Sequence, residues 1–306
     1  MRILLLGANG QVGTELQRSL APLGTVVPAT RNGRLVDGTS CETADLDDTD
    51  ALAALVERVA PDVVANAAAH TAVDRAEDEL DAAMQANAAS PAALAAACER
   101  QGARLLHYST DYVFDGEGIR PYRPDDPTRP LGAYGASKRA GEVAIESSGC
   151  RYLILRTAWV YAAHGHNFLN TMLRLGATRE ELRVVADQVG TPTPAALIAD
   201  ASAHVLHRIA EADGPDRGTW HLTATGSTTW HGFAEAIFDG AVTRGLLDRR
   251  PRVVPIATTD YPTRAARPAY SVLDHSSLQR DFSLSLPSWQ DGLAGVLDTL
   301  STAPAR

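Results

Sequence analysis

The sequence predicts an α/β protein: a doubly wound parallel sheet with a smaller α+β region on its C-terminal side. Three observations support this fold class. Short apolar runs alternate with helical patterns over the first 160 residues, and the first run ends in a glycine-rich turn that opens a helix. Beyond about residue 160 the alternation weakens. Strands that alternate with helices in this way imply right-handed crossovers and a parallel sheet.

The elements of the first half follow from local pattern. Apolar runs bounded by glycine, proline or polar residues predict strands at 2–6, 26–27, 61–65, 103–108 and 152–156. Apolar residues at helical spacing predict helices at 14–20, 48–59 and 79–101, and one that opens near Tyr134. Stretches rich in Gly, Thr, Asn or Pro predict loops at 30–43 and 120–130.

The second half mixes shorter patterns. Helices are expected at 195–210, 230–244 and 288–300, with strands at 182–185, 218–222 and 252–256. We expect residues 1–160 to form a nucleotide-binding domain, to which a later segment of about 182–215 returns. Residues 161–306 should form most of a substrate-binding region.

Composition excludes several classes of protein. The chain has 306 residues, 45% of them hydrophobic and 21% charged, which is ordinary for a globular protein. A net charge of −9 argues against general nucleic-acid binding, which needs a basic face. Cys41, Cys98 and Cys150 form no C-x-x-C pair, so no cysteine metal site is expected and a reducing cytosol is favoured. The run Ile3–Leu6 is too short for a signal segment or a membrane span, so a cytoplasmic protein is expected.

The glycine turn is a candidate cofactor site. Its glycines stand three residues apart, whereas the standard dinucleotide fingerprint reads G-x-G-x-x-G. The physics is similar: a tight turn brings backbone N–H groups and a helix N-terminus to a pyrophosphate. The alternative is a strand–helix turn without a ligand. The residues expected to contact a cofactor are Gly7, Asn9, Gly10, Gln11, Val12 and Gly13.

The second strand indicates which nicotinamide is used. An NAD site normally has a carboxylate at the end of this strand, to bind the ribose 2′-hydroxyl. Here the strand runs into Arg31, which could pair with a 2′-phosphate. NADPH is therefore expected, with NADH possible; the alternative is that Arg31 caps a solvated loop. Asp45 and Leu46 are weaker candidates for the adenine edge.

Tyr134 and Lys138 are candidates for proton transfer. Residues i and i+4 share a helix face, which would place the Lys138 ammonium beside the Tyr134 ring. A cation there should lower the pKa of Tyr134 from about 10, and a lowering by two would correspond to about 2.7 kcal/mol. The alternative is a solvent-facing pair. Thr110 follows the strand 103–108, at the edge where ligands bind in such sheets, and would complete the constellation.

Several motifs in order resemble the extended short-chain dehydrogenases/reductases, and within them the dTDP-4-dehydrorhamnose reductases. The resemblance runs nearly from end to end. It rests on residues 7–13, 66–74, 108–116, 134–138 with Gly141 and Glu142, 155–161, 187–193 and 267–274.

The resemblance implies a reaction and a set of roles. Hydride would pass from NADPH to C4 of dTDP-4-dehydro-L-rhamnose and give dTDP-L-rhamnose, with Tyr134 as the proton donor and Lys138 supporting the phenolate. Thr110, Tyr134 and Lys138 would be catalytic, and the last two would also contact the cofactor. Further cofactor contacts would be Ala67, Ala68, Ala69 and Thr157. The sugar pocket would include His70, Thr71, Val73, Thr110, Asp111, Tyr112 and Trp159, with Trp159 also against the nicotinamide.

The chain departs from the family at a metal site. Some members are described as dimers that hold magnesium through two glutamates, of which Glu15 matches one. The second position falls in residues 194–197, which carry no carboxylate. One protein ligand holds a hard cation poorly, so no metal is expected, and the protein could be a monomer or a homodimer. Glu15 is instead expected in the first turn of its helix, near the positive end of the helix dipole.

Three alternatives stay open. An epimerase or dehydratase would share the fold, but dehydratases of this superfamily resemble Thr-Asp-Glu where this chain has Tyr112. A non-catalytic dinucleotide-binding regulatory subunit would not need the intact Tyr134 and Lys138. A 4-ketoreductase could act on another dTDP-deoxysugar, such as that of dihydrostreptose. Candidate residues for choosing the sugar are His221, Tyr261 and Arg264, and the alternative for each is a structural role.

Overall fold

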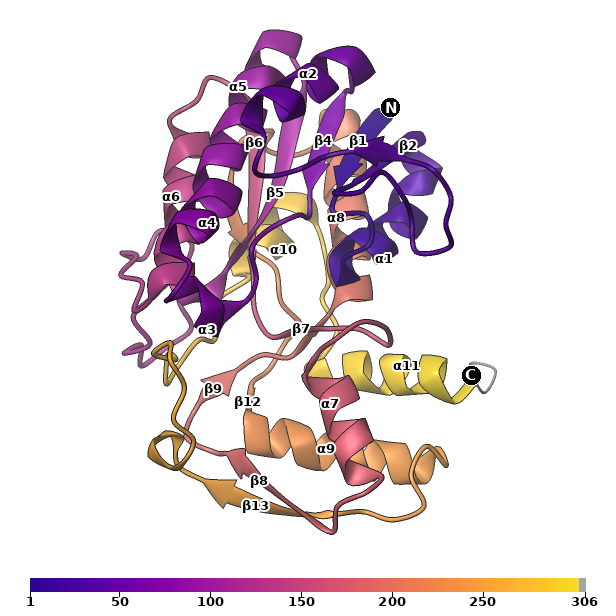
Figure 1. The fold of residues 1–306 in the computed structure, drawn as a ribbon, viewed down its shortest axis with the longest axis vertical. Coiled ribbons are helices and arrows are strands. Elements are labelled where there is room, and N and C mark those ends of the chain that lie inside the picture. The colour runs from indigo at the N-terminus through magenta and orange to yellow at the C-terminus, as the bar shows by residue number, and fades with distance from the viewer. Residues whose placement is uncertain (303–306) are drawn as a thin grey trace.

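The computed structural model describes residues 1–302 and is built around one sheet of seven parallel strands (Figure 1). The strand order is β11-β6-β5-β4-β1-β2-β3, which confirms the predicted doubly wound sheet. The strands are β1 (Arg2–Leu6), β2 (Thr25–Thr30), β3 (Glu42–Thr43), β4 (Val63–Asn66), β5 (Arg104–Thr110), β6 (Arg151–Thr157) and β11 (Gly218–His221).

Helices cover both faces of this sheet. One face carries α1 (Gln11–Leu20), α8 (Ala195–Ala210) and α10 (Ser276–Phe282); the other carries α2 (Thr49–Val59), α5 (Ser90–Gln101) and α6 (Ala133–Glu146). Alternate side chains of β1 enter opposite cores, because successive residues of a strand point to opposite faces. Ile3 and Leu5 pack under α1 and α8, whereas Leu4 and Leu6 pack under α2 and α5.

A smaller part of the molecule lies below the carboxyl ends of the strands (Figure 1). It contains α7 (Phe168–Gly176), α9 (Trp230–Thr243) and α11 (Trp289–Thr302), which share a third core. Short strand pairs complete it: β8 (Glu181–Val185) with β13 (Arg252–Ile256), β7 (Val160–Tyr161) with β10 (Thr193–Pro194), and β9 (Val189–Gly190) with β12 (Thr228–Thr229).

The later chain returns to the sheet through α8, β11 and α10. Helix α8 packs on α1, and β11 pairs with β6. The predicted strand 182–185 instead pairs with β13 in the smaller part, because both strands are short and half-buried over α9. The division of the chain at about residue 160 stays a prediction.

The predicted helix 79–101 is interrupted. It divides into α4 (Leu80–Met84), a wider π-helical turn (Gln85–Ala89) and α5. Asn87 in the wide turn is buried, and its side chain bonds both the N–H and the C=O of His70. Helices α7 and α10, the short helix α3 (Val73–Ala76) and single turns at Ala21–Leu23, Asp111–Val113 and Thr258–Asp260 were not predicted.

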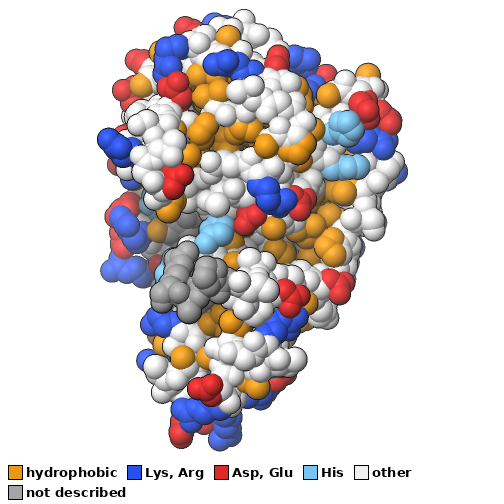
Figure 2. All heavy atoms as spheres, turned by 90° about the vertical axis from the view of Figure 1, so that its right-hand side faces the viewer, with side chains coloured by type: hydrophobic (Ala, Val, Ile, Leu, Met, Phe, Trp, Pro, Cys, Tyr) orange, Lys and Arg blue, Asp and Glu red, His pale blue; other side chains and the backbone are white. Residues whose placement is uncertain are grey.

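The helices and the surface show two further properties. Within residues 1–302, none of the helices combines the length and apolarity needed to cross a membrane. Figure 2 shows one face of the molecule, on which acidic and basic side chains are interspersed.

Candidate active site

The glycine turn between β1 and α1 has the geometry of an anion cradle. Gly7 has a φ of 75°, and a Cβ there would lie 2.8 Å from the backbone of Ala67. A Cβ on Gly13 would lie 2.0 Å from the carbonyl oxygen of Gly7. The first residue before the helix, Gly10, offers no side-chain cap, and the first turn holds no acidic residue. The free N–H groups of α1 are therefore available to a phosphate.

The other predicted cofactor residues surround this turn. The Asn9 side chain bonds the backbone of Arg34 and Val36, and so ties the loop after β2 to the glycine turn. Arg31 is exposed directly after β2, and Leu46 is buried in the core beneath that edge. The remaining predicted residues are all partly buried. Gln11 and Val12 lie at the turn, Asp45 follows β3, and Ala67, Ala68 and Ala69 follow β4.

The predicted catalytic residues converge at the carboxyl ends of β5 and β6. Thr110 ends β5 and Thr157 ends β6, and the two are paired across the strands. Tyr134 lies in the first turn of α6, and its ring meets the ring of Tyr112 edge to face at 5.6 Å. The Thr157 hydroxyl is buried and has no hydrogen-bond partner among the described residues. The Thr157 hydroxyl beside Thr110 is therefore free to bond a ligand.

The expected effect of Lys138 on Tyr134 is wrong in this structure. Burial raises the pKa of Tyr134 above its usual value, and a hydrogen bond with Thr110 offsets only part of the rise. The Lys138 amine lies 2.7 Å from the carbonyl oxygen of Tyr108 and 3.2 Å from Nε2 of His107. The helix spacing placed both residues on one face, but β5 beneath that face offers the amine an acceptor of its own.

Asp111 is the most perturbed carboxyl group of the site. It is buried directly after β5, where Oδ1 accepts a hydrogen bond of 3.0 Å from the Thr110 hydroxyl. Its Oδ2 atom has no partner within residues 1–302. Burial raises the pKa of Asp111 to about 6, against opposing hydrogen bonds from Ser271 and Thr110. The carboxyl group is therefore poised to bind a polar group of a ligand.

The predicted sugar-side residues lie on three segments around this cluster. His70 and Thr71 follow β4, and Val73 opens α3. The His70 backbone is fixed by Asn87, and its Nε2 atom lies 3.4 Å from Glu79. Sequence reasoning missed Asn87, because the wide turn that aims it has no signature in the periodicity of 79–101.

Trp159 stands in an uncommon backbone conformation. Its φ is 47°, and its ring stacks on Trp230 at 3.5 Å with an interplanar angle of 4°. A Cβ on Gly190 would lie 2.4 Å from the Trp159 ring, so that position needs glycine's lack of a side chain. Trp230 was missed, since nothing in the sequence pairs two tryptophans 71 residues apart.

Arg267 is a third residue that sequence reasoning did not assign. It donates to the Tyr112 hydroxyl at 2.9 Å and to Asp74 at 2.7 Å. The loop that holds Arg267 thereby joins α3 to the segment that carries Tyr112. Its signal was present, because Arg267 begins one of the motifs that carried the family resemblance.

The three candidates for choosing the sugar differ in placement. His221 is wholly buried at the end of β11, with its ring edge-on to Phe114 at 5.7 Å. Burial lowers the pKa of His221 to about 3. Tyr261 is exposed, and Arg264 forms an ion pair with Asp78. His221 is therefore a core residue, which agrees with the structural alternative for it.

The expected position of Glu15 is also wrong. Helix α1 begins at Gln11, three residues earlier than predicted, so Glu15 lies in its second turn. Its carboxylate contacts His164 at 3.1 Å and Arg18 at 3.7 Å. Across residues 1–302, no group of three or more His, Cys, Asp and Glu side chains could hold a metal. The absence of a metal, and a monomer or homodimer, remain predictions.

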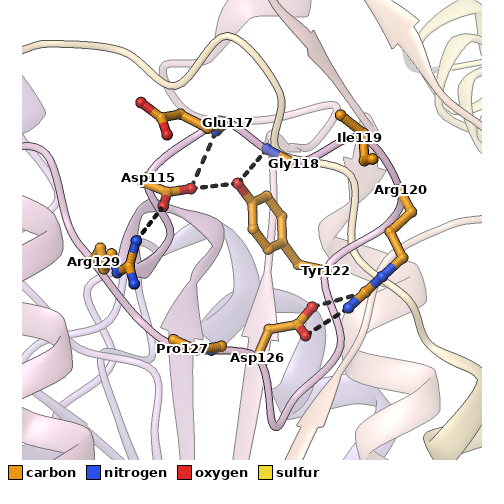
Figure 3. Close-up of a pocket in the computed structure, with 9 residues that line it drawn as sticks. All are labelled: Asp115, Glu117, Gly118, Ile119, Arg120, Tyr122, Asp126, Pro127 and Arg129. Atoms are coloured by element: carbon orange, nitrogen blue, oxygen red, sulfur yellow. Dashed lines mark hydrogen bonds and ion pairs between the residues drawn. The ribbon is translucent and has the colours of Figure 1, made fainter.

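A separate pocket lies in the predicted loop after η3 (Asp111–Val113) (Figure 3). Its carboxylates are already engaged: Asp115 accepts from the Tyr122 hydroxyl at 2.7 Å, and Asp126 is held by Arg120. These two carboxylates of the pocket therefore already have partners within the loop.

Comparison with known proteins identifies the family. The model for the RmlD substrate binding domain matches residues 1–302. A dTDP-4-dehydrorhamnose reductase of Burkholderia thailandensis is 50% identical over 297 residues, covering 95% of this chain and 96% of that protein.

Two solved structures of the same family resemble this protein. A dTDP-4-dehydrorhamnose reductase from Clostridium acetobutylicum is 38% identical with a TM-score of 0.88, covering 99% of this chain and 100% of the other. One from Bacillus anthracis, solved in complex with NADP, is 35% identical with a TM-score of 0.86, covering 97% and 99%. With the glycine cradle and the Thr110–Tyr134–Lys138 cluster, these likenesses show that the chain belongs to the dTDP-4-dehydrorhamnose reductases, a family of Rossmann-fold oxidoreductases.

Proposed function

We propose that this protein reduces the C4 ketone of dTDP-4-dehydro-L-rhamnose to dTDP-L-rhamnose, with NADPH as the hydride donor and Tyr134 as the proton donor. One observation carries the proposal: Thr110, Tyr134 and Lys138 come together at the edge of the sheet on which the glycine cradle opens. A relative that is 50% identical over nearly the whole chain has the name of this activity.

The residues present fit the cofactor. Gly7 and Gly13 let the turn pack tightly against backbone that a Cβ would strike, and the uncapped start of α1 suits the pyrophosphate. Arg31 would pair with the 2′-phosphate, and the unpartnered Thr157 hydroxyl would serve the nicotinamide end. Bound NADPH supplies the hydride. The chain's own part is to hold the ketone oxygen near Thr110 and Tyr134, and to deliver the Tyr134 proton to that oxygen.

Tyr134→Phe tests the proton donor. The change removes the hydroxyl but keeps the ring against Tyr112, so NADPH should still bind. We expect kcat to fall by at least about a hundredfold, which is the usual contribution of a positioned acid. NADPH absorbance is followed with dTDP-4-dehydro-L-rhamnose generated in situ, and the product is identified by chromatography.

The matched control is Tyr152→Phe, because this ring lies on β6 away from the cluster and stacks under Arg217. Its kcat should stay near that of the wild type. Full activity of Tyr134→Phe contradicts the assigned role. If NADPH binds and no oxidation occurs even in the wild type, another dTDP-deoxysugar ketone or a non-catalytic regulatory role gains support.

Arg31→Ala tests the choice of cofactor. A charge-assisted hydrogen bond to a phosphate is worth about 1.5–3 kcal/mol, so the Kd for NADPH should rise by about tenfold or more. The Kd for NADH, which has no 2′-phosphate, should change little. Arg18→Ala, on the solvent side of α1, is the control. Equal losses for both cofactors would remove the role of Arg31.

A further inference from the structure

Lys138 is the only lysine in the sequence; every other long basic side chain is an arginine. It is also buried, on the side of α6 that packs against β5. Its amine has two neighbours, the carbonyl oxygen of Tyr108 at 2.7 Å and Nε2 of His107 at 3.2 Å. The proton on the His107 ring therefore decides what the amine can do.

Asn66 at the end of β4 fixes that proton. Its Oδ1 atom accepts a hydrogen bond from the backbone N–H of Ala68 at 3.2 Å, which sets the orientation of the amide. The amide NH₂ group then faces Nδ1 of the buried His107 at 3.1 Å. Since an amide NH₂ only donates, Nδ1 must accept, and a neutral His107 ring must carry its proton on Nε2.

The Nε2–H group points at Lys138. An ammonium has three N–H donors and no acceptor, so it would meet this group donor to donor. A neutral amine has a lone pair for Nε2–H and an N–H for the Tyr108 carbonyl. Turning the Asn66 amide over only moves the conflict to Ala68. We propose that Asn66 and His107 are positioning residues that disfavour the ammonium form of Lys138 in the cofactor-free protein, so that the amine takes up a proton less readily than an ordinary lysine.

The surrounding charges agree with this. The elements packed on α6 bring these titratable groups to the region: Tyr134 and Glu142 of α6, His107 and Tyr108 of β5, Asp111 and Tyr112 of η3, and Arg156 of β6. Glu142 alone acts to keep Lys138 charged, and it is already paired with Arg156 at 2.8 Å. Burial outweighs it and lowers the pKa of Lys138 to about 8. Arginine, which stays charged in proteins, could not take the neutral form.

The charge state has a consequence for Tyr134, which rests on the proposed reduction. An amine that is less readily protonated favours a phenolate less, which helps Tyr134 to keep its proton in the free protein. That agrees with the raised pKa of Tyr134. The free protein thus holds the protonation state that ketone reduction needs.

Because Lys138 is the only lysine, its charge can be measured without assignment. Protein labelled with lysine carrying ¹³C at Cε gives one lysine signal, whose position reports ionisation of the amine. We expect the signal of the cofactor-free protein to titrate more than about one pH unit below the ordinary lysine value of about 10.4. The measurement uses no substrate, so it stands even if the proposed reduction fails.

Asn66→Asp reverses the direction of the hydrogen bond between residue 66 and His107. A carboxylate at this position accepts from both Ala68 N–H and His107 Nδ1–H, which frees Nε2 to accept from an ammonium. The midpoint for Lys138 should rise by about one pH unit or more. The new negative charge acts through space as well, so Asn66→Asp is repeated in a His107→Phe background. In that background the rise in the Lys138 midpoint should be much smaller. The difference between the two rises is the part transmitted through the His107 ring.

Two results overturn the proposal. One is a wild-type midpoint near the ordinary value; the other is an equal rise in both backgrounds. If a variant does not fold, as judged by circular dichroism, the wild type alone decides the matter. Long-range ¹H–¹⁵N spectra report the tautomer of each of the nine histidines, with His107 assigned from its loss in His107→Gln. A proton on Nδ1 of His107 contradicts the mechanism.

Discussion

Single residues at this site are governed by burial more than by their neighbours in sequence. Tyr134 and Lys138 stand one helical turn apart, yet the amine bonds β5 and the phenol is desolvated. The spacing predicted that the two would share a face. It could not predict His107 and Asn66, which come from two other strands and set where the amine points.

Asp111 gives a pH-dependent prediction at this scale. Its folded-state pKa of about 6 lies above the unfolded value of about 3.9. The wild type therefore has its full stability below about pH 4 and loses part of it as the pH rises through 6. Asp111→Asn does not titrate, so its free energy of unfolding relative to wild type should increase by about 3 kcal/mol from pH 4 to pH 7. Urea unfolding at the two pH values measures this, and an unchanged difference would contradict it.

At the scale of elements, the strand–turn–helix at the N-terminus was the most predictable part. An apolar run, three glycines and a helical pattern need only local physics, and the structure has all three. The helix 79–101 was less predictable. Its wide turn inserts residues to aim Asn87 at His70, and that choice depends on a contact 17 residues away.

Gly13→Ala tests the turn. The added Cβ would lie 2.0 Å from the Gly7 carbonyl oxygen, so α1 must shift from β1 and the phosphate cradle with it. We expect the Kd for NADPH to rise by at least about tenfold, or about 1.4 kcal/mol. Gly295→Ala in α11 is the control, because a Cβ there meets nothing within 4 Å. Both Kd values come from isothermal titration calorimetry, and equal affinities would show that the turn tolerates a side chain.

At the scale of the whole molecule, the sheet depends on residues far along the chain. The core beneath α1 includes Leu206 of α8, Trp220 of β11 and Phe282 of α10. The sequence predicted α8 and β11 but not α10, and it did not fix where β11 pairs, since the pairing of β11 with β6 joins segments more than 60 residues apart. Local pattern shows that a strand exists; only the shape of the partly built sheet decides which edge it joins.

A fragment of residues 1–160 is therefore expected not to fold alone. It would leave the apolar face of α1 uncovered and lose the edge strand beside β6. Thermal unfolding followed by circular dichroism should show no cooperative transition, and NADPH should not bind. Residues 1–302 are the matched comparison. A cooperative fragment that binds NADPH would show that the nucleotide-binding part is autonomous.

The single buried lysine also determines how the protein meets amine-reactive reagents. Acylating agents and aldehyde supports usually attack a protein at many surface lysines, whereas here the only lysine side chain is buried between α6 and β5. Apart from the terminal amine, modification must wait for α6 to move away from β5. The rate of acylation at Lys138 then reports how often α6 separates from β5. A cofactor or substrate that holds α6 against β5 will slow the acylation.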